Sequence, residues 1–299
     1  FTKDFPLLSI KKILEKTNLK LSDIDYVSVG WNPSLHMNFY NPLISKNRTL
    51  REYNFYTISD NLFNLTDRKF GNYTLVKHDN KYFPETYHIN HHISHASTAF
   101  YLSDFNEAAI LTCDFRGENQ CTTFGIGKGN KVKIIESQNL PNSLGLLYAA
   151  YTSLLGFKYD SDEWKVMAMS AYNVDCSEYF KKIRSTYSLK KNGILELDQK
   201  YYLNPFQDRA KNNLYTDKLL TLLKKKNSQS KSKKNIHDIK IAKALQLCSE
   251  EIVTHFLNHL YKVTKCKNVV LGGGFFMNSV FNGKIESKTK FKKSYISFA

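Results

Sequence analysis

The stretch that decides the fold is Asn268-Val-Val-Leu-Gly-Gly-Gly-Phe-Phe-Met-Asn278. Its first four residues form a short apolar run typical of a buried strand, and the three glycines that follow predict a turn. A second helix is expected to begin near Asn278. Before the strand, apolar residues repeat at helical spacing from Asp238 to Val263, which predicts a long amphipathic helix. A helix, a short strand, a glycine turn and another helix indicate an α/β lobe.

The middle of the chain predicts antiparallel strands followed by a buried helix. Apolar runs at Ala108–Cys113, Thr122–Ile126 and Val132–Ile135 are separated by short polar stretches, which favours a meander. The segment Leu144–Leu155 has apolar residues on more than one face, so a largely buried helix is expected there.

The remaining segments are less regular. Helical spacing at residues 7–19 and alternation at residues 24–29 predict a helix that leads into a half-buried strand. Residues 31–84 are polar, aromatic and irregular, and their sequence predicts no regular structure. Residues 173–237 have a drifting pattern and include a lysine-rich run, so we interpret them as an insertion or the edge of a lobe.

Composition places the chain among globular proteins. Of its 299 residues, 42% are hydrophobic, and no apolar run reaches the roughly 18 to 20 residues that cross a bilayer. No signal-peptide pattern opens the sequence, and five cysteines without a CxxC pair fit a reducing compartment, so a cytoplasmic location with no membrane contact is expected.

The net charge of +16 raises the question of nucleic-acid binding. Much of that charge lies in runs such as Lys224–Lys234, KKKNSQSKSKK, which contains no aromatic residue to stack on bases. This pattern favours a solvated loop over a nucleic-acid contact.

The segment YHINHHISHAS contains a candidate metal site. His91 and His95 are four residues apart, so in a helix both imidazoles lie on one face and can chelate one ion. The alternative is a pair of partly buried histidines that bond to their neighbours.

Three further places could bind a ligand. Asp114 follows an expected strand and precedes the residues FRGE, which include Gly117. This arrangement is typical either of a turn that binds a phosphate or a metal, or of an ordinary hairpin turn. Glu163 and Lys165 stand before an apolar stretch, where charged residues are often plain surface. Gly273 and Gly274 would let a ligand approach the backbone, and Asn278 could contact that ligand or merely cap a helix.

Taken in order, the motifs HHISHASTAFY, AAILTCDFRGE, NSLGLLYAAYTSLLGF, DEWKVMA and VVLGGGFFMNSVFNGKI resemble the carbamoyltransferase family of nodulation-factor and antibiotic-tailoring enzymes. The resemblance covers residues 87–172 and 238–298 well. It implies an α/β, two-lobed domain of the actin/hexokinase-like (ribonuclease H-like) fold, related to the threonylcarbamoyl-adenosine synthase subunit. It also implies that residues 1–299 are an incomplete domain, with a first phosphate hairpin before Phe1 and a third metal ligand, an aspartate, and a YrdC-like domain after Ala299.

The resemblance implies a reaction and its participants. A YrdC-like domain would make carbamoyl-adenylate from ATP and carbamoyl phosphate, and this domain would pass the carbamoyl group to a hydroxyl of a sugar or secondary metabolite. A divalent metal, iron in the best understood members, would be held by His91 and His95, with Asp114 as the active-site aspartate. The implied nucleotide-binding residues are Gly117, Glu163, Lys165, Gly273, Gly274 and Asn278.

Two departures from the family pattern keep alternatives open. The family shows DGxGE where this chain has Asp114-Phe-Arg-Gly-Glu118, and glycines where it has Ala168 and Asn173. A metal- and nucleotide-binding module without catalysis is therefore one alternative, and threonylcarbamoyl transfer to tRNA is another. The acceptor and the oligomeric state stay open, with a homodimer among the options.

Overall fold

The computed structural model describes residues 7–32, 73–76, 84–203, 214–225 and 235–297. The chain divides into two compact units, Phe1–His91 and His92–Ala299, and each is described by itself. Most of the irregular stretch 31–84 and of the lysine-rich run lies outside the described residues.

The first unit contains a small three-stranded sheet and a helix. Helix α1 (Leu7–Thr17) and strand β1 (Tyr26–Val29) confirm the predicted helix and strand, with a short 3-10 helix η1 (Leu21–Asp23) between them. Strand β3 (Glu85–Ile89) pairs in parallel with β1 and antiparallel with β2 (Tyr73–Val76). The chain then passes directly from β3 into the helix that begins at His91.

The second unit is built on a mixed five-stranded sheet in the order β10-β9-β4-β5-β6. Strand β9 lies parallel to both β4 and β10, whereas β4, β5 and β6 form the predicted antiparallel meander. These pairings confirm an α/β fold with a mixed sheet. The strands are β4 (Glu107–Cys113), β5 (Gln120–Lys128), β6 (Lys131–Asn139), β9 (Asn268–Gly272) and β10 (Lys293–Ile296).

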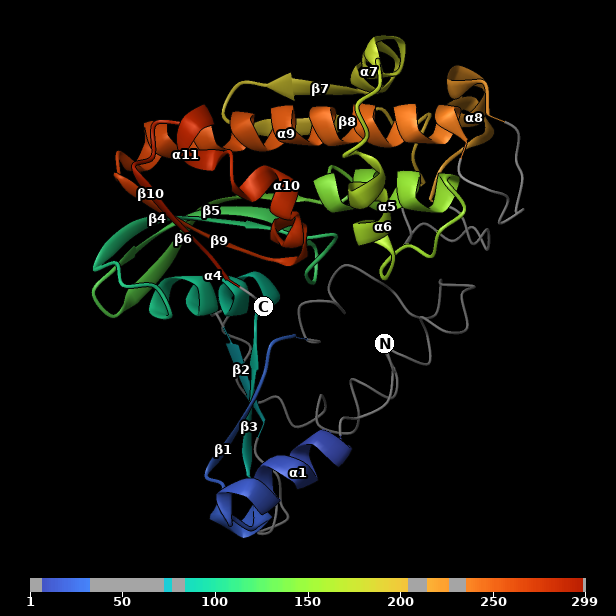
Figure 1. The fold of residues 1–299 in the computed structure, drawn as a ribbon. Helices are drawn as coiled ribbons and strands as arrows, with labels where there is room; N and C mark the ends of the chain where they lie inside the picture. Colours follow the sequence, from blue (N-terminus) through green and yellow to red (C-terminus); the bar gives the residue numbers. More distant parts are fainter. Residues whose placement is uncertain (1–6, 33–72, 77–83, 204–213, 226–234, 298–299) are drawn as a thin grey trace. The chain divides into compact units, whose positions relative to one another are not determined.

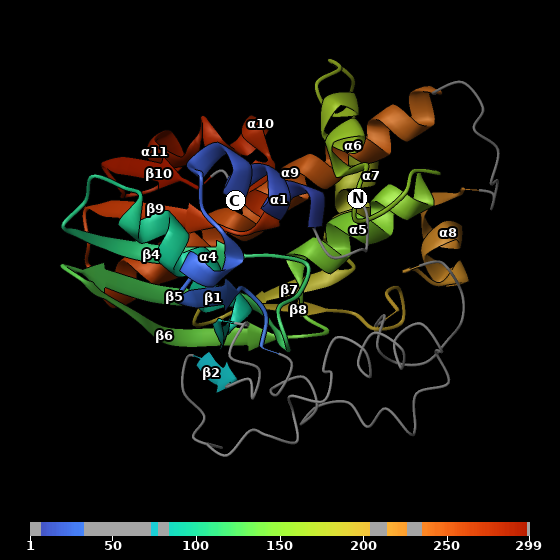
Figure 2. The same cartoon turned by 90° about the horizontal axis from the view of Figure 1, so that it is seen from below.

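Helices cover both faces of this sheet, and the side chains of β4 show why. Ala108 and Ile110 point to one face, where they pack with Ala96, Ala99 and Phe100 of α4 (His91–Tyr101). The alternate residues Ala109, Leu111 and Cys113 belong to the larger core on the other face, which α5 (Leu144–Leu154) and α9 (Ile236–Thr264) cover. Figures 1 and 2 show α4 and α9 on opposite sides of the sheet. A strand buried on both faces is expected to be largely apolar, and between exposed Glu107 and Cys113 the only polar residue of β4 is Thr112.

The long helix α9 is the main support of the second core. Its start is fixed by Asn235, whose side chain accepts a hydrogen bond from the Asp238 amide, and it ends where Lys265 adopts a left-handed conformation. Ile241, Leu245 and Ile252 are among its fully buried residues. The amphipathic pattern thus predicted the helix and its buried face correctly.

Residues 173–237 contribute to this same core. Their described elements are α7 (Ser177–Arg184), the hairpin β7 (Tyr187–Lys190) with β8 (Ile194–Leu197), and α8 (Asp217–Leu223). Ile183, Leu195 and Leu219 are fully buried in the large core cluster. These side chains therefore stabilise the second unit.

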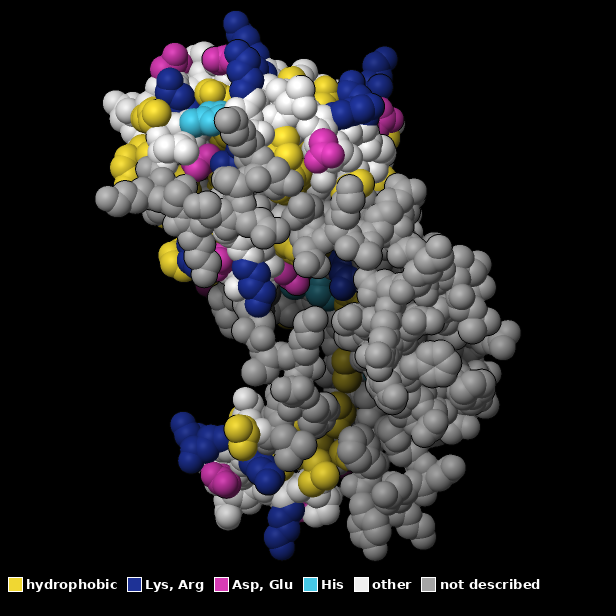
Figure 3. Space-filling view, turned by 90° about the vertical axis from the view of Figure 1, so that its right-hand side faces the viewer, with side chains coloured by type: hydrophobic (Ala, Val, Ile, Leu, Met, Phe, Trp, Pro, Cys, Tyr) yellow, Lys and Arg dark blue, Asp and Glu magenta, His cyan; other side chains and the backbone are white. Residues whose placement is uncertain are grey.

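Two surface properties bear on partners. Among the described residues, no helix combines the length and the apolar character needed to cross a bilayer, although α9 has 29 residues. On the face drawn in Figure 3, described Lys and Arg side chains stand in separate groups with Asp and Glu side chains between them. Lys225, at the start of the lysine-rich run, pairs with Asp238 at 2.6 Å.

Candidate active site

The helix α4 carries both candidate metal-binding histidines in its first two turns. His91 is its first residue and His95 follows four positions later, so the predicted helical spacing is confirmed. Ligand atoms of His91, His95 and Asp114 lie within 4.8 Å of one another, and all three residues are partly buried. One continuous helix fixes the two histidines relative to each other. Their distance to Asp114 therefore depends on how α4 packs against the end of β4.

The ring of His91 is oriented by backbone and aromatic contacts. Its Nδ1 lies 3.0 Å from the carbonyl oxygen of Gly30, and its ring meets that of Trp31 edge-on with centroids 5.5 Å apart. A carbonyl oxygen can only accept, so Nδ1 carries the hydrogen and Nε2 presents the lone pair. That is the tautomer in which a histidine coordinates a metal through Nε2.

His95 and Asp114 meet directly. The Nε2 atom of His95 lies 3.1 Å from Oδ2 of Asp114, and both side chains are about four-fifths buried, with 17% and 21% of their surface exposed. Asp114 is the first residue after β4, and its Oδ1 accepts a hydrogen bond from the Phe115 amide at 2.7 Å. The carboxylate therefore has a fixed orientation toward the helix.

The turn after Asp114 is tied to helix α5. Ser143, the N-cap of α5, accepts a hydrogen bond from the Leu146 amide at 3.0 Å. Its hydroxyl donates to the Phe115 carbonyl oxygen at 2.8 Å and lies 3.1 Å from that of Asp114. One capping residue thus sets both the start of α5 and the position of the aspartate turn.

A residue that the sequence reasoning did not select, His92, seats α4 on the sheet. It is fully buried, its Nε2 lies 3.1 Å from the Gln120 carbonyl oxygen, and its Nδ1 lies 2.6 Å from Oγ1 of Thr112. Oγ1 of Thr112 is in turn 2.5 Å from that of Thr123. Only its position between the two candidate ligands could have drawn attention to His92.

The glycine turn after β9 packs against the same aspartate. Gly273 has φ of +99°, and a Cβ there would lie 2.5 Å from the Cys113 carbonyl oxygen. A Cβ at Gly274 would lie 3.0 Å from Oδ1 of Asp114. The close approach of the two strand ends therefore requires glycine at position 273 and leaves little room for a side chain at position 274.

The site forms at the carboxyl ends of two parallel strands. Strands β4 and β9 pair in parallel with Thr112 opposite Gly272, so Asp114 and Gly273 each follow a strand at the same edge of the sheet. In open α/β sheets, ligands bind at this edge. The structure therefore brings together His91, His95, Asp114, Gly273 and Gly274.

The side chain of Asn278 points away from this edge. It caps helix α10 (Ser279–Asn282), with Oδ1 accepting from the Phe281 amide, and it pairs with Gln246 in the interior. The capping interpretation of Asn278 is confirmed. Gly117 lies in the turn after Asp114, where its amide donates to the Gln120 carbonyl oxygen at 2.6 Å.

The charged residues of α6 (Glu163–Met169) have local partners. The carboxylate of Glu163 accepts from the amides of Asp160 and Ser161 at 2.7 and 2.9 Å. Burial raises the pKa of the Glu163 carboxyl above its ordinary value, although these hydrogen bonds oppose the shift. Lys165 pairs with Asp162 at 2.8 Å and lies over the ring of Trp164, 5.4 Å from its centroid.

Comparison with known proteins identifies the family. A family model described as carbamoyltransferase N-terminus matches residues 4–299. The chain belongs to this family. It is 28% identical to an uncharacterized protein of Synechocystis over 98% of this chain and 48% of that protein. It is 31% identical to the nodulation protein NolNO of Sinorhizobium fredii over 66% of this chain and 26% of that protein. It thus spans less than half the length of these relatives.

In this carbamoyltransferase N-terminal domain, the donor set at the end of β4 fits a metal ion. Two imidazoles and one carboxylate, each about 2.1 Å from an ion, place their donor atoms roughly 3 to 4 Å apart. The observed limit of 4.8 Å leaves only a small adjustment to reach that spacing. Two histidines and one carboxylate also match the donors that bind Fe²⁺ in many non-haem sites.

Proposed function

We propose that this domain carries out ATP-dependent O-carbamoyl transfer, passing a carbamoyl group from carbamoyl-adenylate to a hydroxyl of a sugar or secondary metabolite. Family membership supports the carbamoyl chemistry. The observation that carries the proposal is the convergence of three candidate metal donors and a glycine turn at one edge of the sheet. In the same proposal, the domain has the actin/hexokinase-like fold and receives its adenylate from a YrdC-like domain.

His91, His95 and Asp114 would hold a divalent metal, with iron preferred. When bound, this ion would polarise the carbamoyl carbonyl and offset charge on the leaving phosphate. The chain contributes the orientation of the donors: the Gly30 carbonyl fixes the ring of His91, and the Phe115 amide fixes the carboxylate of Asp114. Asp114 thereby supplies a third donor from within this chain.

Gly273 and Gly274 would receive the adenosine part, because backbone without side chains allows a close approach. Gly117, Glu163, Lys165 and Asn278 complete the proposed nucleotide set, in which Asn278 would act through the turn that it holds, since its side chain bonds Gln246 and the Phe281 amide. The first three would act through the loops that they shape, since their described polar contacts are local.

The proposed reaction breaks the bond between the carbamoyl carbon and a phosphate oxygen of the adenylate. A new bond forms between that carbon and the oxygen of the acceptor hydroxyl. AMP leaves with the bonding electron pair, and the hydroxyl proton is released to a base or to solvent. The products are the O-carbamoylated acceptor and AMP.

The test supplies the chain with a YrdC-like protein, ATP, [14C]carbamoyl phosphate, Fe²⁺ and a panel of sugar acceptors. Label should appear in an acceptor only when the chain is present, and chelation of the metal should abolish the transfer. His95→Ala and Asp114→Asn should reduce transfer by at least about tenfold while adenylate formation by the YrdC-like protein continues. His255→Ala, on α9, is the matched control.

Other outcomes would point to the alternatives. Label in tRNA alone would identify the chain as a threonylcarbamoyl transferase-like enzyme and would contradict the proposed acceptor class. Binding of adenylate without turnover on any acceptor would favour a module that has lost catalysis. Normal transfer by both His95→Ala and Asp114→Asn would show that the metal assignment is wrong.

A further inference from the structure

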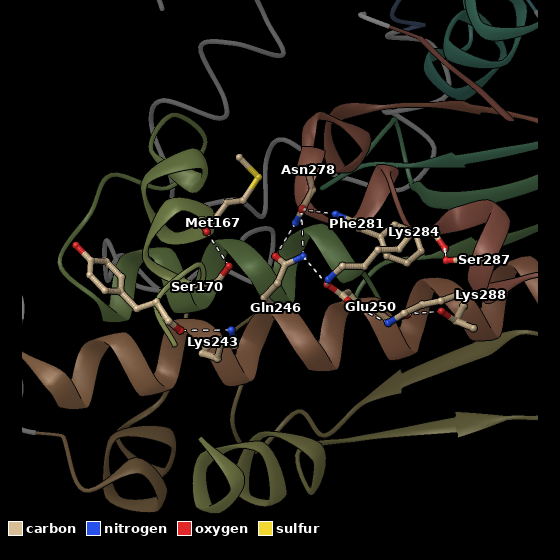
Figure 4. Close-up of polar contacts among 12 residues, drawn as sticks. Met167, Ser170, Lys243, Gln246, Glu250, Asn278, Phe281, Lys284, Ser287 and Lys288 are labelled. Carbon is tan, nitrogen blue, oxygen red and sulfur yellow. Dashed lines mark hydrogen bonds and ion pairs between the residues drawn. The ribbon is translucent and has the colours of Figure 1, made fainter. Parts of the chain in front are cut away.

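A buried amide pair lies directly behind the glycine turn. The carboxamides of Gln246 on α9 and Asn278 face each other, as Figure 4 shows. Nδ2 of Asn278 donates to Oε1 of Gln246 at 2.8 Å, and Nε2 of Gln246 donates to Oδ1 of Asn278 at 3.1 Å. Only 3% and 7% of the surfaces of these two residues is exposed. Such a reciprocal pair is directional, unlike an apolar contact.

Two neighbours determine which way each amide points. The Phe281 amide can only donate, and it contacts Oδ1 of Asn278 at 3.3 Å. The carboxylate of Glu250 can only accept, and its Oε1 lies 3.4 Å from Nε2 of Gln246. With the Phe281 amide as a donor and the Glu250 carboxylate as an acceptor, only one assignment of oxygen and nitrogen in the two carboxamides satisfies every contact.

Glu250 is held in place by two lysines that follow the glycine turn in sequence. Lys284 and Lys288 reach its carboxylate at 2.6 and 2.8 Å, and only 3% of the Glu250 side chain is exposed. Lys288 belongs to α11 (Ile285–Lys288), and Lys284 is its N-cap. Positions 246 and 250 lie on one face of α9, so a single helix face holds the segment from Asn278 to Lys288.

Helix α5 reaches the same amide from another direction. The hydroxyl of Tyr148 donates to Oε1 of Gln246 at 3.4 Å, and its ring meets that of Phe275 edge-on with centroids 6.3 Å apart. Phe275 lies in the 3-10 helix η3 (Gly274–Met277), which begins at the second glycine of the turn. Gln246 is therefore the point where α5, α9 and the glycine turn are joined.

We propose that Gln246 is a positioning residue for nucleotide binding, which acts by holding the Gly273–Asn278 turn against the end of β4 that carries Asp114. Its four hydrogen bonds use both donors and both acceptor positions of the carboxamide. An apolar side chain of the same length would fill the space but would not fix the rotation of the turn. The inference rests on the proposed function, because it assumes that this turn receives the adenosine.

The experiment compares the wild-type chain with Gln246→Met, which keeps the length of the side chain and removes its hydrogen bonds. Binding of AMP is measured by calorimetry, and amide resonances of [15N]glycine-labelled chain are recorded without nucleotide. Gln246→Met should weaken AMP binding about tenfold, because the turn loses the hydrogen bonds that orient it and part of the binding free energy is then spent on ordering it. It should also move the resonances of Gly273 and Gly274 and leave those of Gly129 and Gly156 in place.

Asn258→Ala is the matched control, because Asn258 is an exposed amide on the same helix. It should change neither AMP binding nor the resonances of the turn. Combining Gln246→Met with Asn278→Ala should cost less affinity than the sum of the two single changes, since both break the same pair.

The outcomes separate the two proposals. Wild-type affinity together with unmoved Gly273 and Gly274 resonances in Gln246→Met would overturn the positioning role. A wild-type chain that does not bind AMP would contradict the proposed function, and the glycine resonances alone would then decide whether Gln246 holds the turn. A shift of all glycine resonances together would indicate a general loss of stability and would also contradict the inference.

Discussion

At the scale of single residues, Gly273 is constrained by backbone atoms rather than by side chains. Gly273 combines a φ of +99° with a Cβ direction that meets the Cys113 carbonyl oxygen at 2.5 Å. Neither obstacle can be relieved by turning a flexible side chain. At the next position, a Cβ on Gly274 would lie 3.0 Å from Oδ1 of Asp114, so the turn and the aspartate are in close contact.

Substitution of Gly273 should therefore cost stability as well as ligand binding. We expect Gly273→Ala to lower the free energy of unfolding by about 2 to 4 kcal/mol, because it adds backbone strain to a steric overlap. Urea unfolding measures this effect. Gly283→Ala is the control, since Gly283 has φ of −67° and nothing lies within 4 Å of its Cβ position, and it should be nearly neutral. Equal stabilities of the two variants would contradict the role of the close approach.

Residue spacing alone identified part of this site. His91 and His95 were predicted as a pair because four residues make one helical turn, and α4 confirms the helix. The contact of His95 with Asp114 joins residues 19 positions apart, and it depends on how α4 packs on β4. The inward orientation of Asn278 depends on Gln246, which is 32 positions away. A pattern of neighbouring residues cannot predict contacts between residues so far apart in the sequence.

At the scale of elements, α4 is fixed to the sheet by a polar contact within an apolar interface. His92 is fully buried between Thr112 and the Gln120 carbonyl oxygen, beside the apolar contacts of Ala96 and Phe100. We expect His92→Leu to destabilise the chain by about 1 to 3 kcal/mol, because it leaves buried polar groups without this partner. Binding of Co²⁺ should weaken as well. His255→Leu, at a half-buried position on α9, is the control for both unfolding and metal titration.

The contact between α9 and the α11 region should depend on pH. Burial alone would raise the pKa of the Glu250 carboxyl, but hydrogen bonds from Lys284 and Lys288 outweigh it, so the pKa is lowered from 4.5. The ionised carboxylate therefore stabilises the fold above about pH 4.5, and this contribution is lost as the pH falls through the lowered value. We expect Glu250→Gln to cost about 1 to 2 kcal/mol at pH 7, since the partly exposed lysines limit the loss.

Urea unfolding of wild type and Glu250→Gln at pH 7 and pH 3 tests the sign of this effect. The difference between the two proteins should shrink as the pH falls, because acidification progressively protonates the carboxylate and removes its advantage over the amide. Glu178→Gln is the control, because the exposed carboxylate of Glu178 pairs with Lys182 on α7 and should matter little at either pH. A difference that grows on acidification would contradict the assignment.

At the scale of the whole molecule, the hydrophobic patterns predicted the individual helices and strands better than the way in which the strands pair. The apolar runs predicted β4, β5, β6 and β9, and the amphipathic repeat predicted α9, because each pattern reflects the burial of local side chains. Residues 173–237 looked irregular because their elements are short, yet Ile183, Leu195 and Leu219 complete the large core. The parallel pairing of β9 with β4 joins segments about 160 residues apart, which no window of sequence reveals.

The division into two units leads to a prediction about the isolated second unit. Both described hydrophobic clusters lie within residues 92–299, so we expect this fragment to fold without residues 1–91 and to melt cooperatively. Its glycine turn is intact, so under the proposed function it should bind AMP with nearly wild-type affinity. It lacks His91, however, and should bind Co²⁺ at least about tenfold more weakly than the whole chain.

The full-length His91→Ala variant is the matched control. It should likewise retain AMP binding and lose most of its metal binding. A folded fragment that has lost AMP binding would show that the nucleotide site depends on the first unit, whereas a fragment that fails to melt cooperatively would contradict the independence of the second core.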